Sequence, residues 1–262
     1  MSRYENWLNV ALEAGDKAGK LLRGRWRQAH TVHHKGFRDI VTEADLECET
    51  LIIEHLRKAF PDHAVTSEEA GAEISDAKVH WFVDPLDGTT NFSRNNPNFS
   101  TSIAAVEDGW PVVGVVVDPL REHVFAAWRG GGATLNGTPI HVSGVDAIAE
   151  AIFAVDSPRE PQLRDAMWQR LGVLLRYGRT MRASGSAALN IAYVAVGWID
   201  LYMHLSLKPW DQTAAALFVE EAGGALSTIA GAPWTPFSPD PLIASSAALL
   251  DAFHNLMSQA GL

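Results

Sequence analysis

The sequence predicts a layered α/β fold, and three observations support this prediction. The chain opens with two helical patterns, continues with β-prone runs separated by turn residues, and ends with strands and helices in alternation. Its composition, 47% hydrophobic and 20% charged over 262 residues, is that of a globular protein with a buried core. This length permits one large domain or two small ones.

Two helices are expected at the start of the chain. Apolar residues recur at steps of three and four over residues 3–27, which predicts one amphipathic helix. After a short connection, Thr42 and Asp45 have the spacing of a capping pair. The apolar positions that follow them predict a second helix, which ends at Pro61.

A sheet is expected next. The apolar run VHWFV at residues 79–83 predicts a strand, and the turn residues of DPLDGTTNF at 84–92 lie at the C-terminal end of that strand. Three β-rich runs between residues 100 and 136 are separated by Asp-Gly, Asp-Pro and Gly-rich breaks. Such breaks between β-prone runs predict an antiparallel meander.

Strands and helices alternate in the second half of the chain, which is typical of layered α/β packing. The patterns predict, in order, a strand at 151–155, a helix near 161–175, a helix that opens at 184–186, a strand at 199–203, a helix from Asp211, strands at 226–229 and 242–245, and a helix over 247–260. No repeat or low-complexity tract interrupts this order.

Charge and cysteine content exclude several classes of partner and site. With 31 acidic against 21 basic residues the net charge is −10, so a basic surface for nucleic acid or an anionic membrane is not expected. The single cysteine, Cys48, excludes an internal disulfide and a zinc site built of cysteines. The sequence shows neither a signal-peptide pattern nor an apolar stretch of membrane-spanning length. We therefore expect a cytoplasmic protein with no nucleic-acid partner and no membrane partner.

Candidate chemistry is concentrated in carboxylates at the ends of expected elements. Asp84 and Asp87 stand three residues apart across a Pro-Leu turn, so both can point at one or two hard cations such as Mg²⁺. Gly88 and Thr89 follow at once, and a flexible glycine before hydroxyl and free N–H groups is suited to cradle an anion. A carboxylate pair beside an anion cradle indicates metal-assisted phosphate chemistry. Further acidic residues at such positions are Asp45, Glu68, Glu69 and Asp211.

Each of these features also has a purely structural explanation. Local structure alone would account for turn aspartates at 84 and 87, a solvated acidic pair at 68–69, helix caps at Asp45 and Asp211, and a helix start at 184–186. The structural explanation is the simpler one for each feature taken singly. Their joint occurrence in one chain is what requires a common cause.

Four blocks in the chain resemble the inositol monophosphatase family of magnesium-dependent, lithium-sensitive sugar phosphatases. The blocks are Lys35 with DIVTEAD at 39–45, SEE at 67–69, WFVDPLDGTTNF at 81–92, and the pair GSAALNIAYVAVGWIDLY and KPWDQTAAALFVEEAGG within 185–224. Their order and spacing match the family over nearly the full chain, and DPLDGTTNF is a highly specific signal.

The resemblance implies a role for each matching residue. It implies metal ligation by the carboxylates of Glu68, Asp84, Asp87 and Asp211 and by the carbonyl of Leu86, with Lys35 near the metals. It implies that Thr89, paired with Asp45, activates the attacking water, and Glu69 is grouped with these catalytic residues. The phosphate is expected on the backbone of Gly88 and Thr89, and the alcohol of the substrate against Gly185, Ser186 and Ala187.

The resemblance also implies the architecture and the reaction. The expected fold is an α-β-α-β-α sandwich of the sugar-phosphatase type, formed as a single domain over residues 1–262 with two α/β halves, roughly 1–145 and 146–262, and the site between them. The expected protein is a homodimer that carries two or three Mg²⁺ ions per subunit. Its expected substrate is a small phosphorylated polyol or sugar, and its expected reaction converts inositol-1-phosphate and water into inositol and phosphate.

One position departs from the family pattern and keeps other substrates open. Inositol-specific members carry a glutamate seven residues before the aspartate of W-D, where this chain has His204. A histidine in the pocket could titrate near neutral pH and attract a second phosphate, whereas a solvent-exposed histidine would have no role. TTNF at 89–92 also resembles sugar-bisphosphate enzymes, which keeps fructose-1,6-bisphosphate as an alternative substrate, and KPWD at 208–211 resembles histidinol-phosphate phosphatases, which keeps histidinol phosphate. A non-catalytic homologue that binds a partner is the alternative of a different class.

Overall fold

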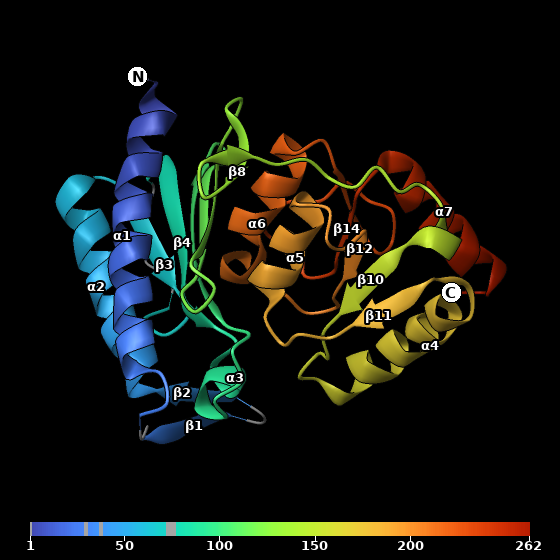
Figure 1. Cartoon of the computed structure of the whole chain (residues 1–262), viewed down its shortest axis with the longest axis horizontal. Coiled ribbons are helices and arrows are strands. Elements are labelled where there is room, and N and C mark those ends of the chain that lie inside the picture. The colour runs from blue at the N-terminus through green and yellow to red at the C-terminus, as the bar shows by residue number, and fades with distance from the viewer. Residues whose placement is uncertain (1, 29–30, 37–38, 72–76) are drawn as a thin grey trace.

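The helices and the two larger sheets stack in five layers (Figure 1). The computed structural model describes residues 2–28, 31–36, 39–71 and 77–262. From one side to the other, the layers are α1 (Arg3–Arg25) with α2 (Glu43–Ala59), a seven-stranded sheet, α5 (Ala187–Ala195) with α6 (Pro209–Glu221), a five-stranded sheet, and α4 (Pro161–Tyr177) with α7 (Ala247–Gln259). The predicted α-β-α-β-α order is confirmed.

The seven-stranded sheet contains the predicted meander. Its strands lie in chain order: β3 (Ala64–Ser67), β4 (Val79–Asp87), β5 (Ser100–Glu107), β6 (Trp110–Asp118), β7 (His123–Trp128), β8 (Gly132–Leu135) and β9 (Thr138–Pro139). Only β3 and β4 run parallel, and every later pair is antiparallel. Asp108 and Gly109 join β5 to β6 with φ of 51° and 82°, the left-handed pair that favours a two-residue hairpin turn.

Strand β4 extends further than the sequence predicts. The expected strand ends at residue 83, but β4 continues to Asp87, and its register with β5 shifts between Asp84 and Asp87. Pro85 lies in this irregular stretch and cannot donate a ladder hydrogen bond, which accounts for the break. Gly88, with φ of 88°, then ends the strand and leads into the short helix α3 (Thr89–Ser93). The DPLD segment is thus held inside the sheet rather than in a turn beyond it.

The five-stranded sheet belongs entirely to the second half of the chain. Its order is β11 (Thr180–Arg182), β10 (Ile152–Val155), β12 (Leu201–Met203), β14 (Pro241–Ala244) and β13 (Ala225–Thr228), preceded by the 3₁₀ turn η1 (Ile148–Glu150). Strands β11, β10 and β12 are parallel, whereas β14 pairs antiparallel with both its neighbours. The predicted alternation of strands and helices is therefore confirmed.

Several short strands were not expected from the sequence. The connection before α2 forms a hairpin of β1 (Val32–Gly36) and β2 (Asp39–Thr42), while β3, β8, β9 and β11 extend the larger sheets. Strand β1 is exposed at every position, so its residues carry no apolar alternation that could reveal it. The predicted cap of α2 at Thr42 is confirmed. Asp211, in contrast, is the third residue of α6, because Pro209 begins that helix.

Helix α6 is buried at every position from Gln212 to Val219 because it lies between two sheets. Gly114 on β6 permits its close approach: a Cβ at that position would lie 2.6 Å from the carbonyl oxygen of Ala214. The same closeness brings the start of α6, with Asp211, toward the end of β4. Among the described residues, no helix combines the length and the apolar character needed to cross a membrane.

Candidate active site

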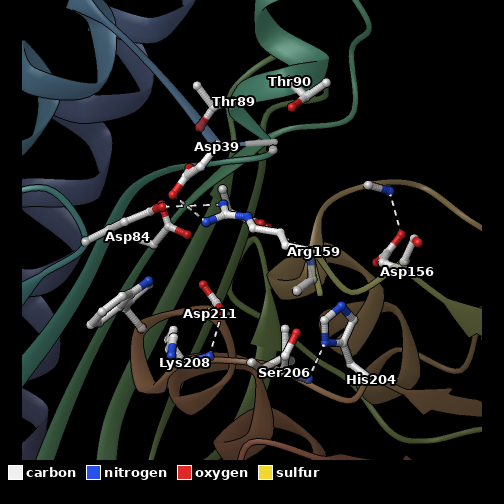
Figure 2. Close-up of a pocket in the computed structure, with 18 of the residues that line it drawn as sticks. Asp39, Asp84, Thr89, Thr90, Asp156, Arg159, His204, Ser206, Lys208 and Asp211 are labelled. Atoms are coloured by element: carbon white, nitrogen blue, oxygen red, sulfur yellow. Dashed lines mark hydrogen bonds and ion pairs between the residues drawn. The ribbon is translucent and has the colours of Figure 1, made fainter. Parts of the chain in front are cut away.

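A cavity of about 650 Å³ lies where the end of β4 meets the starts of α3, α5 and α6. Figure 2 shows that its walls come from both halves of the chain. The predicted site residues that line it are Lys35, Glu68, Asp84, Leu86, Asp87, Gly88, Thr89, Gly185, Ala187, His204 and Asp211. Asp45, Glu69 and Ser186 do not line it, but each hydrogen-bonds to a residue that does.

Asp45 serves as a helix cap and as the partner of Thr89 at the same time. Its Oδ2 accepts hydrogen bonds from the backbone N–H of Thr42 at 2.8 Å and from the Thr42 hydroxyl at 2.6 Å. Its Oδ1 lies 3.0 Å from the Thr89 hydroxyl, which is also 3.0 Å from the carbonyl oxygen of Leu86. The structural and the functional explanation of Asp45 are therefore compatible, since each uses a different carboxylate oxygen.

Burial makes Asp45 a better proton acceptor than an ordinary aspartate. Desolvation raises its pKa to about 6, although hydrogen bonds from Thr42 and Thr89 lower that pKa in part. The carboxylate is still ionised at neutral pH, where it can take a proton through the Thr89 hydroxyl. This is the range of pKa that suits a general base near pH 7.

The carboxyls of Asp84 and Asp211 are crowded in the base of the cavity. Burial and then repulsion from Glu68, Asp87 and Asp211 raise the pKa of Asp84 well above its ordinary value. Burial followed by repulsion from Glu68 raises the pKa of Asp211 to about 8. Each carboxylate accepts one local backbone hydrogen bond, from Leu86 at 3.0 Å and from Lys208 at 2.7 Å. Such a cluster favours a bound cation, because a cation removes the repulsion.

Asp87 joins the two halves of the chain at the site. It accepts hydrogen bonds from the backbone N–H groups of Ala187 at 3.2 Å and Ala188 at 3.0 Å and from the Ser186 hydroxyl, all at the start of α5. These bonds lower its pKa, but burial outweighs them and raises it to about 7. The contacts fix the Gly185–Ala187 segment against the carboxylates of the first half.

The donor set of the cavity fits Mg²⁺ in its chemistry. Buried carboxylates beside the carbonyl of Leu86 are the hard oxygen ligands that this cation prefers. In the described ranges, no three side chains of acidic residues, histidine or cysteine converge tightly enough to hold an ion as they stand. The Glu68 carboxylate instead forms ion pairs with two basic side chains: its Oε1 lies 3.2 Å from Lys35 Nζ and 3.8 Å from Arg159 Nη2.

Lys35 pairs with both glutamates of the SEE block. Its ammonium lies 2.5 Å from the Oε1 of Glu69 and 3.2 Å from that of Glu68. Burial raises the pKa of Glu69 to about 7, in spite of the opposing effect of Lys35. The predicted proximity of Lys35 to the candidate metal ligands agrees with this geometry, whereas Glu69 reaches the site only through Lys35.

His204 lines the cavity but cannot act as the predicted titrating group. Its side chain is buried, and burial lowers its pKa to about 4, while Glu160 raises and Arg159 lowers that pKa to smaller extents. Its Nδ1 accepts a hydrogen bond from the backbone N–H of Ser206 at 3.1 Å (Figure 2). Both expectations are therefore corrected: the ring is neither solvent-exposed nor protonated near neutral pH.

Asp156 and Arg159 line the cavity but were not singled out from the sequence. Asp156 follows β10, and its carboxylate accepts hydrogen bonds from Gly185 N at 2.8 Å and from Asn190 Nδ2 at 2.6 Å. A carboxylate at the end of a predicted strand was the available signal for it. Arg159 extends across the cavity (Figure 2), and its Nη1 lies 2.8 Å from Asp39 Oδ2. No pattern in the sequence marks this contact, because it joins segments far apart in the chain.

The raised carboxyl pKa values predict a specific dependence of stability on pH. Asp45, Asp87 and Asp211 have higher pKa values in the folded chain than their ordinary value of 3.8. The folded state therefore binds more protons than the unfolded state, and stability falls as pH rises through the range of about 6 to 8. In EDTA we expect the melting temperature at pH 6 to exceed that at pH 8.5 by ~5 °C or more.

The measurement is a series of thermal melts with and without Mg²⁺. Added Mg²⁺ should raise the melting temperature most at pH 8.5, where the carboxylates are ionised. Melting temperatures in EDTA that rise with pH over this range would contradict the crowded carboxylate cluster.

Comparisons with known proteins show the family of this chain. The family model described as the inositol monophosphatase family matches residues 3–261. Inositol monophosphatase 2 of Solanum lycopersicum is 39% identical over 97% of this chain and 99% of its own length. The Nus factor SuhB of Escherichia coli (strain K12) is 40% identical over 86% of this chain and 85% of its own. An IMPase structure from Thermotoga maritima has a TM-score of 0.89 and 33% identity, and covers 98% of both chains. This protein belongs to the inositol monophosphatase family.

Proposed function

We propose that this chain is a Mg²⁺-dependent phosphomonoesterase that hydrolyses inositol-1-phosphate to inositol and phosphate. The observation that carries the proposal is the Thr89–Asp45 pair beside the buried carboxylates of Asp84 and Asp87 and the part-buried Asp211. A hydroxyl on a buried base next to a cation-binding pocket is the arrangement that water-based attack on a phosphate ester requires. Membership of a phosphatase family supports the same conclusion.

In this proposal the carboxylates of Glu68, Asp84, Asp87 and Asp211 and the carbonyl of Leu86 would hold Mg²⁺. When bound, it would offset the phosphate charge and make water a stronger nucleophile. Thr89 orients the water, and Asp45 receives its proton through the hydroxyl hydrogen bond of 3.0 Å. No covalent bond to the enzyme forms.

The phosphate is proposed to rest on the backbone of Gly88 and Thr89. Only glycine fits at position 88, because a Cβ would lie 2.9 Å from the Asn98 carbonyl oxygen and 3.2 Å from that of Gly185. The alcohol is proposed to lie against Gly185, Ala187 and His204, which line the cavity, whereas the predicted contact with Ser186 is replaced by its hydrogen bond to Asp87. Asp156, which bonds the Gly185 N–H, holds this wall in place.

The test is phosphate release from a panel of esters. We expect Mg²⁺-dependent release from inositol-1-phosphate above that from fructose-1,6-bisphosphate, histidinol phosphate and adenosine bisphosphate. EDTA should abolish release, and Li⁺ should inhibit it more than Na⁺ at matched ionic strength. Release that persists in EDTA, or release from none of the esters, would overturn the proposal.

Fructose-1,6-bisphosphate is the second candidate substrate, and His204 is the observation that favours it. Because its Nδ1 accepts the Ser206 N–H, the neutral ring of His204 offers the cavity an Nε2–H donor where inositol-specific members have an acceptor-only carboxylate. We expect His204→Glu to raise the kcat/KM ratio of inositol-1-phosphate to fructose-1,6-bisphosphate by ~10-fold, the scale of one good hydrogen bond.

In the parent chain the same ratio should stay constant from pH 6 to 8.5, because His204 remains neutral throughout that range. A ratio that His204→Glu leaves unchanged would exclude His204 from substrate selection. A parent ratio that turns toward the bisphosphate at acid pH would show that the ring titrates in this range.

Assembly and location complete the proposal. A homodimer is proposed, and light scattering of the purified chain tests it.

The net charge of −10 supports a protein without a nucleic-acid partner. RNA binding of the purified chain at physiological salt is the direct check of this proposal. The single, buried Cys48 supports a cytoplasmic location.

A further inference from the structure

One face of α2 contacts three segments that build the site. Asp45, Cys48 and Glu49 are spaced by three and four residues, which places them on the same side of the helix. Asp45 holds Thr89, and the Cys48 thiol donates to the carbonyl oxygen of Pro85 at 3.3 Å. The third of these residues, Glu49, has no part in the mechanism above and does not line the cavity.

Glu49 binds the segment that carries Glu68. It is 7% exposed, and its Oε1 accepts hydrogen bonds from the backbone N–H of Glu69 at 3.0 Å and of Ala70 at 2.9 Å. The Ser67 hydroxyl donates to the same oxygen. All three donors therefore belong to residues within two positions of Glu68, the residue expected to ligate a metal.

In the described part of the chain, a small set of backbone hydrogen bonds holds the rest of this turn, while Lys35 and Arg159 contact its side chains. Ser67 and Gly71 exchange backbone hydrogen bonds of 3.0 and 3.3 Å, and the N–H of Glu68 donates to the Val83 carbonyl at 3.2 Å. A buried carboxylate that accepts several N–H groups is a strong, directional anchor, since its own desolvation is compensated only in that geometry. The orientation of the turn thus depends on Glu49.

We propose that Glu49 is a positioning residue: its Oε1 holds the Ser67–Ala70 turn so that Glu68 is presented to the divalent cation. The inference rests on the proposed function, because it concerns the same metal site. It assigns a role to a carboxylate outside the cavity, which acts through hydrogen bonds to the turn and not through its charge.

The experiment is calorimetric titration of the substrate-free full chain with Mg²⁺. Glu49→Ala should bind Mg²⁺ at least ~10-fold more weakly than the parent, the lower end of the effect of supporting residues at metal sites. Glu49→Gln keeps an oxygen at the Oε1 position and should bind almost as tightly as the parent. Glu49→Asp keeps the charge but withdraws the oxygens by one methylene, and should bind weakly.

Glu47→Ala is the matched control. Glu47 lies on the same helix, is exposed, and pairs with Arg25 away from the turn. We expect its Mg²⁺ affinity to equal that of the parent. Circular dichroism and thermal melts establish that each variant is folded. Should Glu49→Ala fail to fold, the contrast between Glu49→Gln and Glu49→Asp decides the question.

Three results would overturn either the positioning role of Glu49 or the proposed function. Equal affinity of Glu49→Ala, Glu49→Asp and the parent would remove the positioning role alone. Tight binding by Glu49→Asp with weak binding by Glu49→Gln would also remove it, because charge would then be the relevant property. A parent chain that binds no Mg²⁺ would overturn the proposed function, and this inference would fall with it.

Discussion

Asp84→Asn is expected to lower the rate of phosphate release by at least ~10²-fold while it raises the melting temperature of the metal-free protein. The loss follows because one buried ligand of the proposed cation site is replaced by a neutral amide. The gain follows because the pKa of Asp84 is raised by burial and by the neighbouring carboxylates, so its ionised form is unfavourable in the fold.

The two readouts are phosphate release in Mg²⁺ and thermal melts in EDTA at pH 8. Asp251→Asn, an exposed substitution of the same chemistry on α7, should change neither. A variant that is inactive because it is misfolded would melt at a lower temperature than the parent. Undiminished activity of Asp84→Asn would contradict the proposed metal site. It would favour a reaction that does not depend on a metal.

Thr89→Ala is expected to reduce kcat by ~10²-fold with little change in KM. The hydroxyl of Thr89 is the link of 3.0 Å between the cavity and the buried Asp45 carboxylate. Its removal leaves the carboxylates and the phosphate cradle in place, so the affinity for substrate should persist while the water loses its orientation. A residue that acts mainly in the transition state shows this separation of kcat from KM.

Thr89→Ser provides the control for this prediction. Serine keeps the hydroxyl and should restore most of the lost kcat, whereas a purely structural role of the threonine methyl group would not be rescued. Steady-state kinetics with inositol-1-phosphate at saturating Mg²⁺ measures both variants. An unchanged kcat in Thr89→Ala would remove Thr89 and its hydrogen bond to Asp45 from the mechanism.

Local patterns predicted most of the fold. The period of the apolar residues located α1 and α2, and the paired turn residues located the meander of β5 to β7. The exposed strand β1 was not predicted, because a segment without a buried face shows no periodic spacing of apolar residues. The predicted strand ended too early, at residue 83, because Pro85 and Gly88 indicate a turn. In the structure, pairing with β5 continues strand β4 past the proline to Asp87.

The same distinction, between local sequence pattern and contacts between distant segments, applies to the candidate site. By itself, the sequence determined which carboxylates and hydroxyls stand close together along the chain, as Asp84, Asp87 and Thr89 do. The family resemblance of the sequence also implied the pairing of Asp45 with Thr89, and the structure shows it as a hydrogen bond across 44 residues. Only the tertiary structure decided that Asp87 binds Ser186 across 99 residues and that His204 is buried and neutral. Proton affinity and hydrogen bonding depend on the dielectric surroundings and on partners within a few ångströms, and folding brings those partners from distant parts of the chain.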